Sequence, residues 1–374
     1  MKFKIAASLL SERLQILTKI LPSKPSTPII GYFLFELDGN VLTVTATDGD
    51  TTLVSTLAVA EAQENGRAAV MAKNMDIVHE LKDQLISFQV NPSNFKINLE
   101  SETGKYEFVG ASADEYPQHR ALSDEAVTLE APAQLLAEGI GQTSFAVAPT
   151  EDMRPIMGGL YFDATSGNGL NIVATDAHKL ARFHMDDITV SEPSAFVMPA
   201  KPANVLRTLL GGEGDARVSV RFDGNAIYCK TSKYWILTRQ IEGKYPAYSA
   251  VIPTANPIEV IVDRAQLLSA VRRVDVCSAG ANLTRFKISK GTLLIATQDI
   301  DYSLSGQETL PCQYDGDEVE IGFKATLVKE MLGILTSQDV MIQMSDSAHP
   351  GLFVPYQKKD GCDVLMLLMP MMLS

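Results

Sequence analysis

The sequence has little that would support a disulfide scaffold, a membrane span or a metal centre. Only 4 of its 374 residues are cysteines, and no two of them form a Cys-x-x-Cys pair. We therefore expect free thiols in a reducing compartment and no metal site. The longest apolar stretch, Val364 to Leu373, is far shorter than the roughly 18 residues that cross a bilayer. The first apolar run, Ile5 to Leu10, ends too early for a secretory signal, which favours a cytoplasmic protein.

Familiar catalytic motifs are missing as well. The chain contains no G-x-x-x-x-G-K-[ST], G-x-S-x-G or H-E-x-x-H pattern. Asp176 and His178 place a carboxylate close to an imidazole, so an enzyme that uses these two residues is one reading. Only the Thr-Asp part of this segment recurs along the chain, which favours a structural turn for the aspartate. The sequence therefore predicts a protein without catalysis and without a cofactor.

Positive charge is in short supply. The chain has 32 Lys and Arg against 45 Asp and Glu, a formal net charge of −13. Proteins that bind nucleic acid usually present a basic surface, so the total by itself argues against a DNA partner. An acidic peptide-binding scaffold that does not act on DNA is the alternative that this total favours.

What the sequence does contain is a threefold repeat. Residues 42–48, 170–176 and 293–299 each read as an apolar strand that ends in threonine and aspartate, and their threonines lie 128 and 122 residues apart. A lysine landmark and an X-Pro landmark recur at nearly the same spacing, at Lys73, Lys201 and Lys324 and at Pro117, Pro246 and Pro370. We therefore predict three copies of one domain, at residues 1–126, 127–255 and 256–374.

Each repeat is predicted to run strand, helix, hairpin, helix, hairpin. Two helices are too few to cover both faces of so many strands, so we expect an α+β fold with the helices on one side of antiparallel sheets. The six predicted helices carry a charge of about +3, which leaves about −16 elsewhere. A surface lined by the helices would therefore be neutral to basic. These helices are expected at residues 8–20, 73–83, 132–143, 201–211, 263–275 and 324–335.

The chain ends in a run of methionines. Residues 364–368 are predicted to form a buried strand, and Pro370 must end its regular pairing. Met371 and Met372 lie beyond that proline. Flexible exposed methionines suit a groove that accepts varied apolar partners, so we predict a partner-binding site near this terminus.

Four segments, in this order and spacing, resemble the bacterial DNA polymerase III beta subunits, the sliding clamps. They are Lys24-Pro-x-x-Pro28-Ile-Ile-Gly31, Ala174-Thr-Asp-Ala-His-Lys-Leu180, Gly243-Lys-Tyr-Pro-x-Tyr248 and Met369-Pro-Met371. The resemblance implies three clamp domains per chain and a head-to-tail homodimer that closes into a ring, with helices lining the hole. It also implies a function without catalysis: the ring encircles duplex DNA non-specifically and tethers the replicative polymerase, which confers processivity.

The resemblance further implies three sets of residues. Short apolar peptides of the polymerase, the clamp loader and other partners would dock in a groove formed by Met157, Thr175, Ala177, His178, Lys179, Leu180, Pro246, Val251, Leu367, Met369, Pro370 and Met371. Residues facing DNA would be Lys24, Lys73, Arg154, Lys201, Arg207, Arg272 and Lys324. The dimer interface would include Tyr106, Phe108, Arg272, Val276 and Cys277.

The chain departs from the family pattern around the groove. Ala177 stands where the motif usually has glycine, and Lys179 where it has arginine. Ala250 and Met372 also stand where basic residues occur in relatives. The rim is thus less basic than is usual, and we expect partner peptides to rely less on acidic groups.

Overall fold

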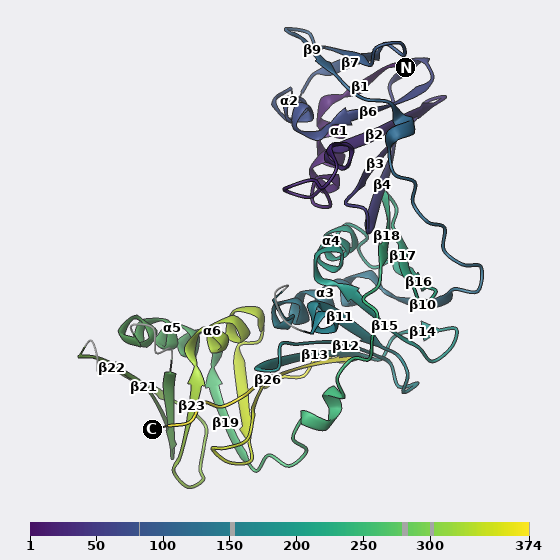
Figure 1. Ribbon diagram of the computed structural model, residues 1–374. Helices are drawn as coiled ribbons and strands as arrows, with labels where there is room; N and C mark the ends of the chain where they lie inside the picture. Colours follow the sequence, from purple (N-terminus) through teal and green to yellow (C-terminus); the bar gives the residue numbers. More distant parts are fainter. Residues whose placement is uncertain (82, 150–153, 279–282, 300–302, 374) are drawn as a thin grey trace. The chain divides into compact units, whose positions relative to one another are not determined.

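The computed structural model describes residues 1–81, 83–149, 154–278, 283–299 and 303–373. The chain divides into two compact units. The first holds Met1–Gln134 and Lys201–Gln240, and the second holds Leu135–Ala200 and Ile241–Ser374 (Figure 1). Among the described residues, no helix is long and apolar enough to span a membrane, and all four cysteines are free thiols.

The first unit contains two antiparallel sheets. One sheet has the strand order β5-β1-β7-β8-β9, and in the other the strands that belong to this unit follow the order β10-β16-β17-β18-β4-β3-β2-β6. The elements are β1 (Lys2–Ala6), α1 (Ala7–Leu17), β2 (Tyr32–Asp38), β3 (Val41–Thr47), β4 (Thr51–Ala58), β5 (Glu61–Glu64), β6 (Gly66–Met71), α2 (Asp76–Glu80), β7 (Leu85–Val90), β8 (Lys96–Glu100), β9 (Lys105–Val109), β10 (Val127–Pro132), α4 (Ala200–Leu210), β16 (Arg217–Phe222), β17 (Ala226–Lys230) and β18 (Tyr234–Arg239).

The second unit is built in the same way. Its sheets run β15-β11-β12-β13-β26-β25-β24-β19 and β22-β21-β20-β23. The elements are α3 (Ala133–Thr143), β11 (Gly159–Asp163), β12 (Leu170–Thr175), β13 (Lys179–Met185), β14 (Thr189–Val190), β15 (Ala195–Pro199), β19 (Ile258–Asp263), α5 (Arg264–Asp275), β20 (Leu283–Ser289), β21 (Thr292–Asp299), β22 (Leu304–Pro311), β23 (Val319–Lys324), α6 (Ala325–Ile334), β24 (Asp339–Met344), β25 (Gly351–Pro355) and β26 (Cys362–Leu368).

Alternating apolar residues on the strands form the cores. In the first unit, Phe3 of β1 and Phe88 of β7 stack with ring centroids 5.2 Å apart, and Phe35 of β2 lies 5.5 Å from Phe88. In the second unit, Phe323 of β23 meets Phe353 of β25 at 5.6 Å. The Phe3–Phe88 contact joins neighbouring strands of one sheet, whereas the Phe35–Phe88 and Phe323–Phe353 contacts each join two different sheets. Full burial of one such side chain stabilises the fold by about 1.5–3 kcal/mol, so these phenylalanines hold the sheets of each unit together.

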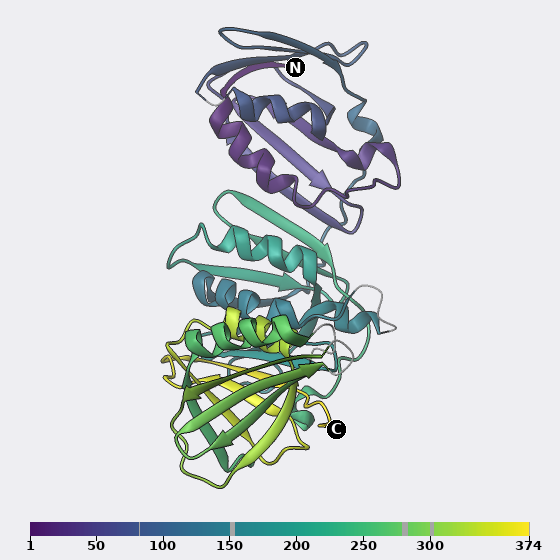
Figure 2. The same ribbon diagram turned by 90° about the vertical axis from the view of Figure 1, so that its left-hand side faces the viewer.

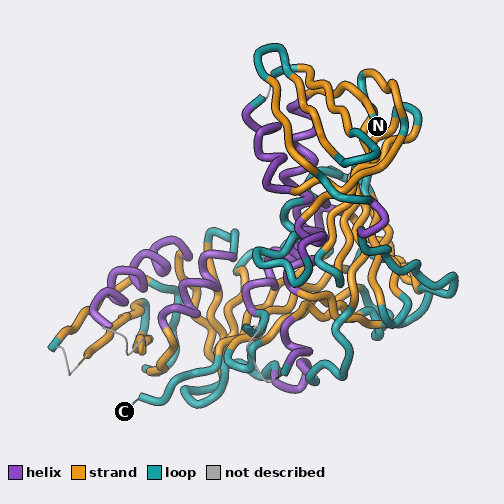
Figure 3. Tube along the Cα trace, turned by 45° about the horizontal axis from the view of Figure 1, so that its top comes forward, coloured by secondary structure: helices purple, strands orange, loops and turns teal. Residues whose placement is uncertain are grey.

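Within each unit the α-helices lie on one side of the strands, as the sequence predicted (Figure 2 and Figure 3). Asp263 caps α5 as expected, because its side chain accepts a hydrogen bond of 2.7 Å from the Gln266 N–H. The helix expected at 73–83 is shorter: a 3-10 turn, Ala72–Met75, leads into α2. The predicted hairpins gain a third strand in each half of a repeat, for example β4 after β2 and β3.

The threefold order of elements is visible along the chain, but the compact units cut across it. The middle repeat is divided because its two sheets continue into different neighbours. Its β18 pairs with β4 of the first repeat, and its β13 pairs with β26 of the third. The boundaries at residues 126 and 255 stay a prediction.

Candidate peptide-binding groove and DNA-facing residues

An apolar cluster lies in the second unit, where β13 and β26 run side by side. Leu180 on β13 pairs directly with Leu367 on β26. Because side chains alternate along a strand, both project from the same face of the sheet. The buried members are Val173, Leu180, Val197, Tyr245, Leu352, Leu365 and Leu367, and Ile156, Tyr161, Ile241, Tyr248, Ile252 and Val354 pack against them. Residues from the second and third repeats thus form one apolar surface.

Three tyrosines line this cluster. The rings of Tyr161 and Tyr245 stack with centroids 4.6 Å apart, and Tyr248 meets Tyr161 edge-on at 6.1 Å. The Tyr248 hydroxyl donates a 2.8 Å hydrogen bond to Asp163. Burial raises the pKa of Tyr245 and of Tyr248 far above the usual value. The phenols are therefore neutral at physiological pH, and they present stacking faces to an apolar ligand.

The rim of the cluster is exposed and apolar. Val251 is 54% exposed and Met369 is 43% exposed, and Pro246 and His178 are also exposed. The Met369 N–H donates a 2.9 Å hydrogen bond to the His178 carbonyl, so the terminal segment is tied to the loop after β12. Beyond it, the Met371 N–H bonds to the Gly322 carbonyl on β23 at 2.8 Å. These bonds position the C-terminal segment beside the cluster.

The Thr-Asp landmark forms the structural turn that the sequence predicted. Asp176 Oδ1 accepts hydrogen bonds from the N–H groups of His178 and Lys179, at 2.9 and 2.8 Å. The Thr175 hydroxyl donates to the Lys179 carbonyl at 2.7 Å and accepts from the Ala177 N–H. These bonds use the Asp176 carboxylate to shape a turn, which favours the structural role over the enzyme that would use Asp176 and His178.

The first repeat forms the same turn, and it has a glycine at the position that Ala177 occupies in the second. Asp48 and Thr47 make the equivalent bonds around Gly49. Gly49 has φ +100° and Ala177 has φ +73°. In the third repeat the Thr297 hydroxyl donates instead to the Leu283 carbonyl, and the side chain of Asp299 lies outside the described residues. An alanine therefore adopts a conformation at 177 that favours glycine.

Replacing that alanine should stabilise the second unit. We expect Ala177→Gly to raise its free energy of unfolding by about 0.5–1 kcal/mol, because relief of the left-handed strain exceeds the entropy that glycine adds to the unfolded chain. Urea unfolding followed by tyrosine fluorescence would measure the shift. The matched change Gly49→Ala should lower the unfolding midpoint of the first unit. A lower midpoint for Ala177→Gly would contradict the assignment of strain.

Three of the expected groove residues lie elsewhere or serve another purpose. Lys179 is 7% exposed, and its ammonium bonds to Glu330 at 2.7 Å and contacts Asp176 at 3.5 Å. It points to the face of β13 opposite Leu180, so it does not form the rim. Met157 is 1% exposed, and its neighbour Ile156 packs against the cluster instead. The Thr175 hydroxyl is used within the turn.

The sequence did not predict that three tyrosines line the cluster. Tyr245 and Tyr248 lie in a segment that carries the family resemblance, but neither they nor Tyr161 and Ile241 were among the expected groove residues. The signal that could have found Tyr161 is its alternation with buried residues on β11. Nothing local could have paired it with Tyr245, which is more than 80 residues away in the sequence.

The expected DNA-facing residues are all exposed. In the first unit, Lys24 lies in the loop before the 3-10 helix Pro28–Gly31, and Lys73 lies in the turn before α2. Arg207 lines a shallow groove of about 550 Å³ together with Lys201 and Lys19, a lysine that sequence reasoning missed. The ammonium of Lys201 is 3.2 Å from Asp48, so its charge is partly neutralised. Arg154, Arg272 and Lys324 are the exposed members in the second unit.

The helices are less basic than predicted. Within the observed bounds, α4 and α5 each carry +2, α2 carries −2, α3 carries −1, and α1 and α6 are neutral, a total of +1. The difference of two from +3 arises because Lys19, Lys73 and Lys324 lie just outside the helices, and Asp263 outside α5 offsets one of these three charges. The acidic charge still lies mostly on strands and loops.

Each unit has an open edge strand near the residues expected at the dimer interface. β9 is the edge of its sheet in the first unit, and β22 is an edge in the second. Tyr106 and Phe108 on β9 are half-buried. Near β22, Val276 is 79% exposed, Arg272 is exposed and Cys277 is half-buried. Open edges of this kind are templates for pairing with another chain. The interface expected from the sequence included residues of β9 but none of β22.

Comparison with known proteins accounts for nearly the whole chain. Family models of the DNA polymerase III beta subunit match it three times: the N-terminal domain at residues 1–120, the central domain at 130–247 and the C-terminal domain at 249–372. The chain belongs to the DNA polymerase III beta subunit family. This family is the non-catalytic beta sliding clamp, and the three-domain clamp fold predicted from the sequence is confirmed.

Individual members of the beta subunit family match over their full length. The beta sliding clamps of Synechocystis sp. and Pseudomonas aeruginosa are 28% and 27% identical to this chain, and each match covers all of both chains. The solved DNA polymerase sliding clamp of Pseudomonas aeruginosa superimposes with a TM-score of 0.91 at 27% identity, over all of both chains. A sliding clamp from the same organism bound to griselimycin gives a TM-score of 0.92.

Proposed function

We propose that this beta clamp closes with a second copy into a ring around duplex DNA and tethers DNA polymerase III to its template. The observation that carries the proposal is the match of all three clamp domains across the chain. Family membership also decides against the acidic scaffold unrelated to DNA. A net charge of −13 fits a clamp, because tight phosphate contacts would stop sliding and enclosure needs none.

The two open edges support closure of the ring. β9 of one copy would pair with β22 of the other, which satisfies backbone groups that are otherwise open. Tyr106 and Phe108 would then meet the apolar surface of Val276 and the end of α5. This arrangement is head-to-tail and uses β9 and β22 once per chain, so two copies close with neither of these two strands left unpaired.

The apolar cluster supports the docking of short partner peptides. Its tyrosines and leucines offer an apolar wall, and Val251, Pro246 and Met369 offer an exposed apolar rim. Lys179 is buried and does not reach this rim. Among the described residues that were named for the groove, no other lysine or arginine supplies a positive charge there. Partner peptides should therefore gain their affinity mainly from apolar side chains.

The decisive test of the function is topological. Loaded by its clamp loader onto nicked circular DNA, the protein should stay on the DNA at a salt concentration that disrupts ordinary phosphate contacts. Cutting the circle once should release it within minutes, because an enclosing ring slides off an end. Gel filtration of the DNA-bound fraction before and after the cut would measure this. Retention on the linear product would show binding by contact and contradict the proposal.

A further inference from the structure

The threefold repeat places a counterpart of the apolar cluster in the first unit. In the second unit Leu180 on β13 pairs with Leu367 on β26. In the first unit β4 and β18 pair in the same way and bring Thr52 opposite Leu237. Thr52 and Leu180 are equivalent, because each also pairs with the threonine of a Thr-Asp landmark. The first unit therefore repeats the strand junction on which the proposed groove is built, with different side chains.

The segments that follow the X-Pro landmarks correspond as well. Tyr116 precedes the landmark proline of the first repeat and Tyr245 that of the second, and both tyrosines are buried. Three residues after Tyr245, Tyr248 meets a ring of the apolar cluster edge-on. Three residues after Tyr116, His119 meets Trp235 edge-on, with ring centroids 5.1 Å apart. The segment between β9 and β10 thus borders the junction in the first unit, as the segment after β18 borders the cluster in the second.

The side chains that face outward at the first junction are aromatic. Tyr228 on β17 and Trp235 on β18 are half-buried, and their ring centroids lie 5.9 Å apart. Tyr228 pairs with Leu237, so the two lie on the same face of the sheet. The residues that follow each ring, Cys229 and Ile236, are 1% exposed and face the core. The aromatic rings therefore project from the side of the sheet away from the core.

This side of the sheet is also basic. At the outward positions of β16, β17 and β18, all within the described residues, there is no acidic residue, and there are four basic ones: Arg217, Arg221, Lys230 and Arg239. Arg239 is 3.4 Å from Asp50. Arg221 and Lys230 form no ion pair with any residue that the structure describes. In a chain of net charge −13, two positive charges beside aromatic rings favour an acidic partner.

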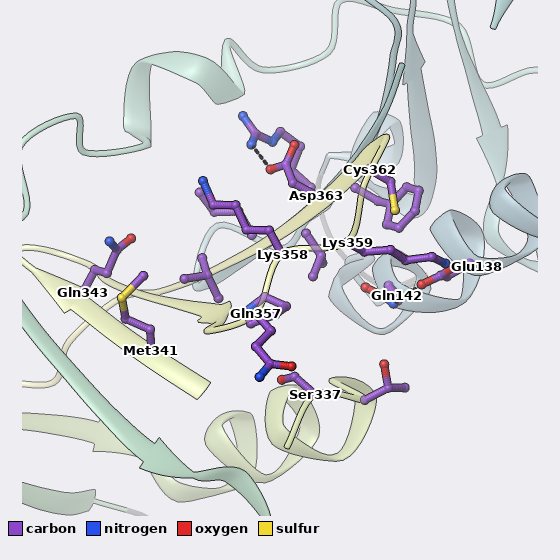
Figure 4. Close-up of a pocket in the computed structure, with 17 residues that line it drawn as sticks. Glu138, Gln142, Ser337, Met341, Gln343, Gln357, Lys358, Lys359, Cys362 and Asp363 are labelled. Carbon is purple, nitrogen blue, oxygen red and sulfur yellow. Dashed lines mark hydrogen bonds and ion pairs between the residues drawn. The ribbon is translucent and has the colours of Figure 1, made fainter. Parts of the chain in front are cut away.

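The second unit lacks this charge at the corresponding strands. Gln343 stands where Arg221 lies, because each is two strands away from the equivalent paired leucine. The outward Arg182 on β13 is paired with Asp363 at 2.7 Å; Figure 4 shows Gln343 and Asp363 in this part of the second unit. The two junctions therefore share their backbone pairing and differ in charge, so they suit different ligands.

We propose that the basic-aromatic face of the first unit, formed by Arg221, Tyr228, Lys230, Trp235 and Leu237, is a second docking surface for short extended peptides that alternate acidic and apolar residues. The carboxylates pair with Arg221 and Lys230, and the apolar side chains pack on Trp235 and Leu237. Tryptophan, tyrosine and arginine dominate the energetics of many protein interfaces. That the ligand is a peptide rests on the proposed function of the groove, whereas its acidity follows from the charges of this face.

The test uses the fact that Trp235 is the only tryptophan in the chain. The probe is acetyl-Glu-Leu-Glu-Leu-Glu-amide, titrated into full-length Val251→Asp, which carries a carboxylate at the rim of the apolar cluster and so disfavours binding there. Tryptophan emission should change with a Kd of about 0.1–1 mM. The matched peptide with glutamine in place of each glutamate should bind at least tenfold more weakly. Raising the salt concentration to about 0.5 M should also weaken binding of the acidic peptide.

Variants of the face locate the charge. Arg221→Ala and Lys230→Ala combined in one chain should weaken binding of the acidic peptide at least tenfold. Both side chains reach solvent, so the fold should survive, and thermal unfolding checks this. Lys358→Ala is the control, because Lys358 is an exposed lysine of the second unit, and it should leave binding unchanged.

Several results would each overturn the proposal. They are equal affinity for the glutamate and glutamine peptides, undiminished affinity in the double variant, and calorimetric binding without a change in the emission of Trp235. Tighter binding of an oligothymidylate than of the acidic peptide would assign the face to single-stranded nucleic acid instead. Failure of the groove itself gives a separate signal, namely tight binding of a polymerase peptide by Val251→Asp without any change at Trp235.

Discussion

Val251→Asp should abolish the binding of partner peptides while leaving the protein folded. Val251 is 54% exposed beside the apolar cluster, so a carboxylate is tolerated there in the free protein. A docked apolar peptide would remove that carboxylate from water without supplying a partner, which costs several kcal/mol. We expect the Kd of a peptide from a polymerase subunit to rise at least 100-fold in isothermal calorimetry.

A matched control separates docking from a general effect of charge. Val41 on β3 is 47% exposed and belongs to the first unit, whereas the cluster belongs to the second. Val41→Asp should bind the peptide as the unmodified protein does. Thermal unfolding should give similar midpoints for all three proteins. Tight peptide binding by Val251→Asp would show that the peptide docks at another surface.

Phe108→Asp should convert the dimer into monomers. Phe108 lies on the open edge strand β9, on the same face as Tyr106. In the proposed dimer it is buried against the partner copy, and an aspartate there would be desolvated without compensation. We expect dimerisation to weaken at least 100-fold, about 2.7 kcal/mol. Light scattering should then report 40.6 kDa at concentrations where the unmodified protein has twice that mass.

The opposite side of the contact offers an independent variant. Val276 is 79% exposed in the single chain, so Val276→Asp should also give monomers if β22 and the end of α5 receive β9. Tyr356→Asp is the control, because Tyr356 is 45% exposed and lies outside both edges. Dimers that persist in both Phe108→Asp and Val276→Asp would place the interface elsewhere.

The sequence predicted secondary structure well where the stabilising hydrogen bonds join residues that are close together in the chain. The Thr-Asp turns close within five residues, so Thr175 and Asp176 were enough to predict one. The cap at Asp263 is equally local. The length of α2 was predicted less well, because the helical pattern continued while the chain turned at Leu81 toward β7. Capping and chain reversal decide where such a helix ends, and its apolar pattern does not.

The groove was only partly predictable. Leu180 and Leu367 were implied by the family resemblance, but the ion pair of the buried Lys179 with Glu330 was not predicted, because Glu330 lies 151 residues away in the sequence. The pairing of Tyr161 with Tyr245 depends likewise on a distant partner. The alternation along a strand predicts which face of the sheet a side chain lies on. The residue that it contacts there depends on which strands become neighbours in the fold.

The sequence by itself determined the threefold repeat, the alternation of helices and strands, and the turn at Asp176, since each depends on residues close together in the chain. Tertiary structure decided the apolar cluster, because Leu180 of the second repeat and Leu367 of the third become neighbours through the register of β13 on β26. A slip of one residue in that register would turn Leu367 to the opposite face from Leu180.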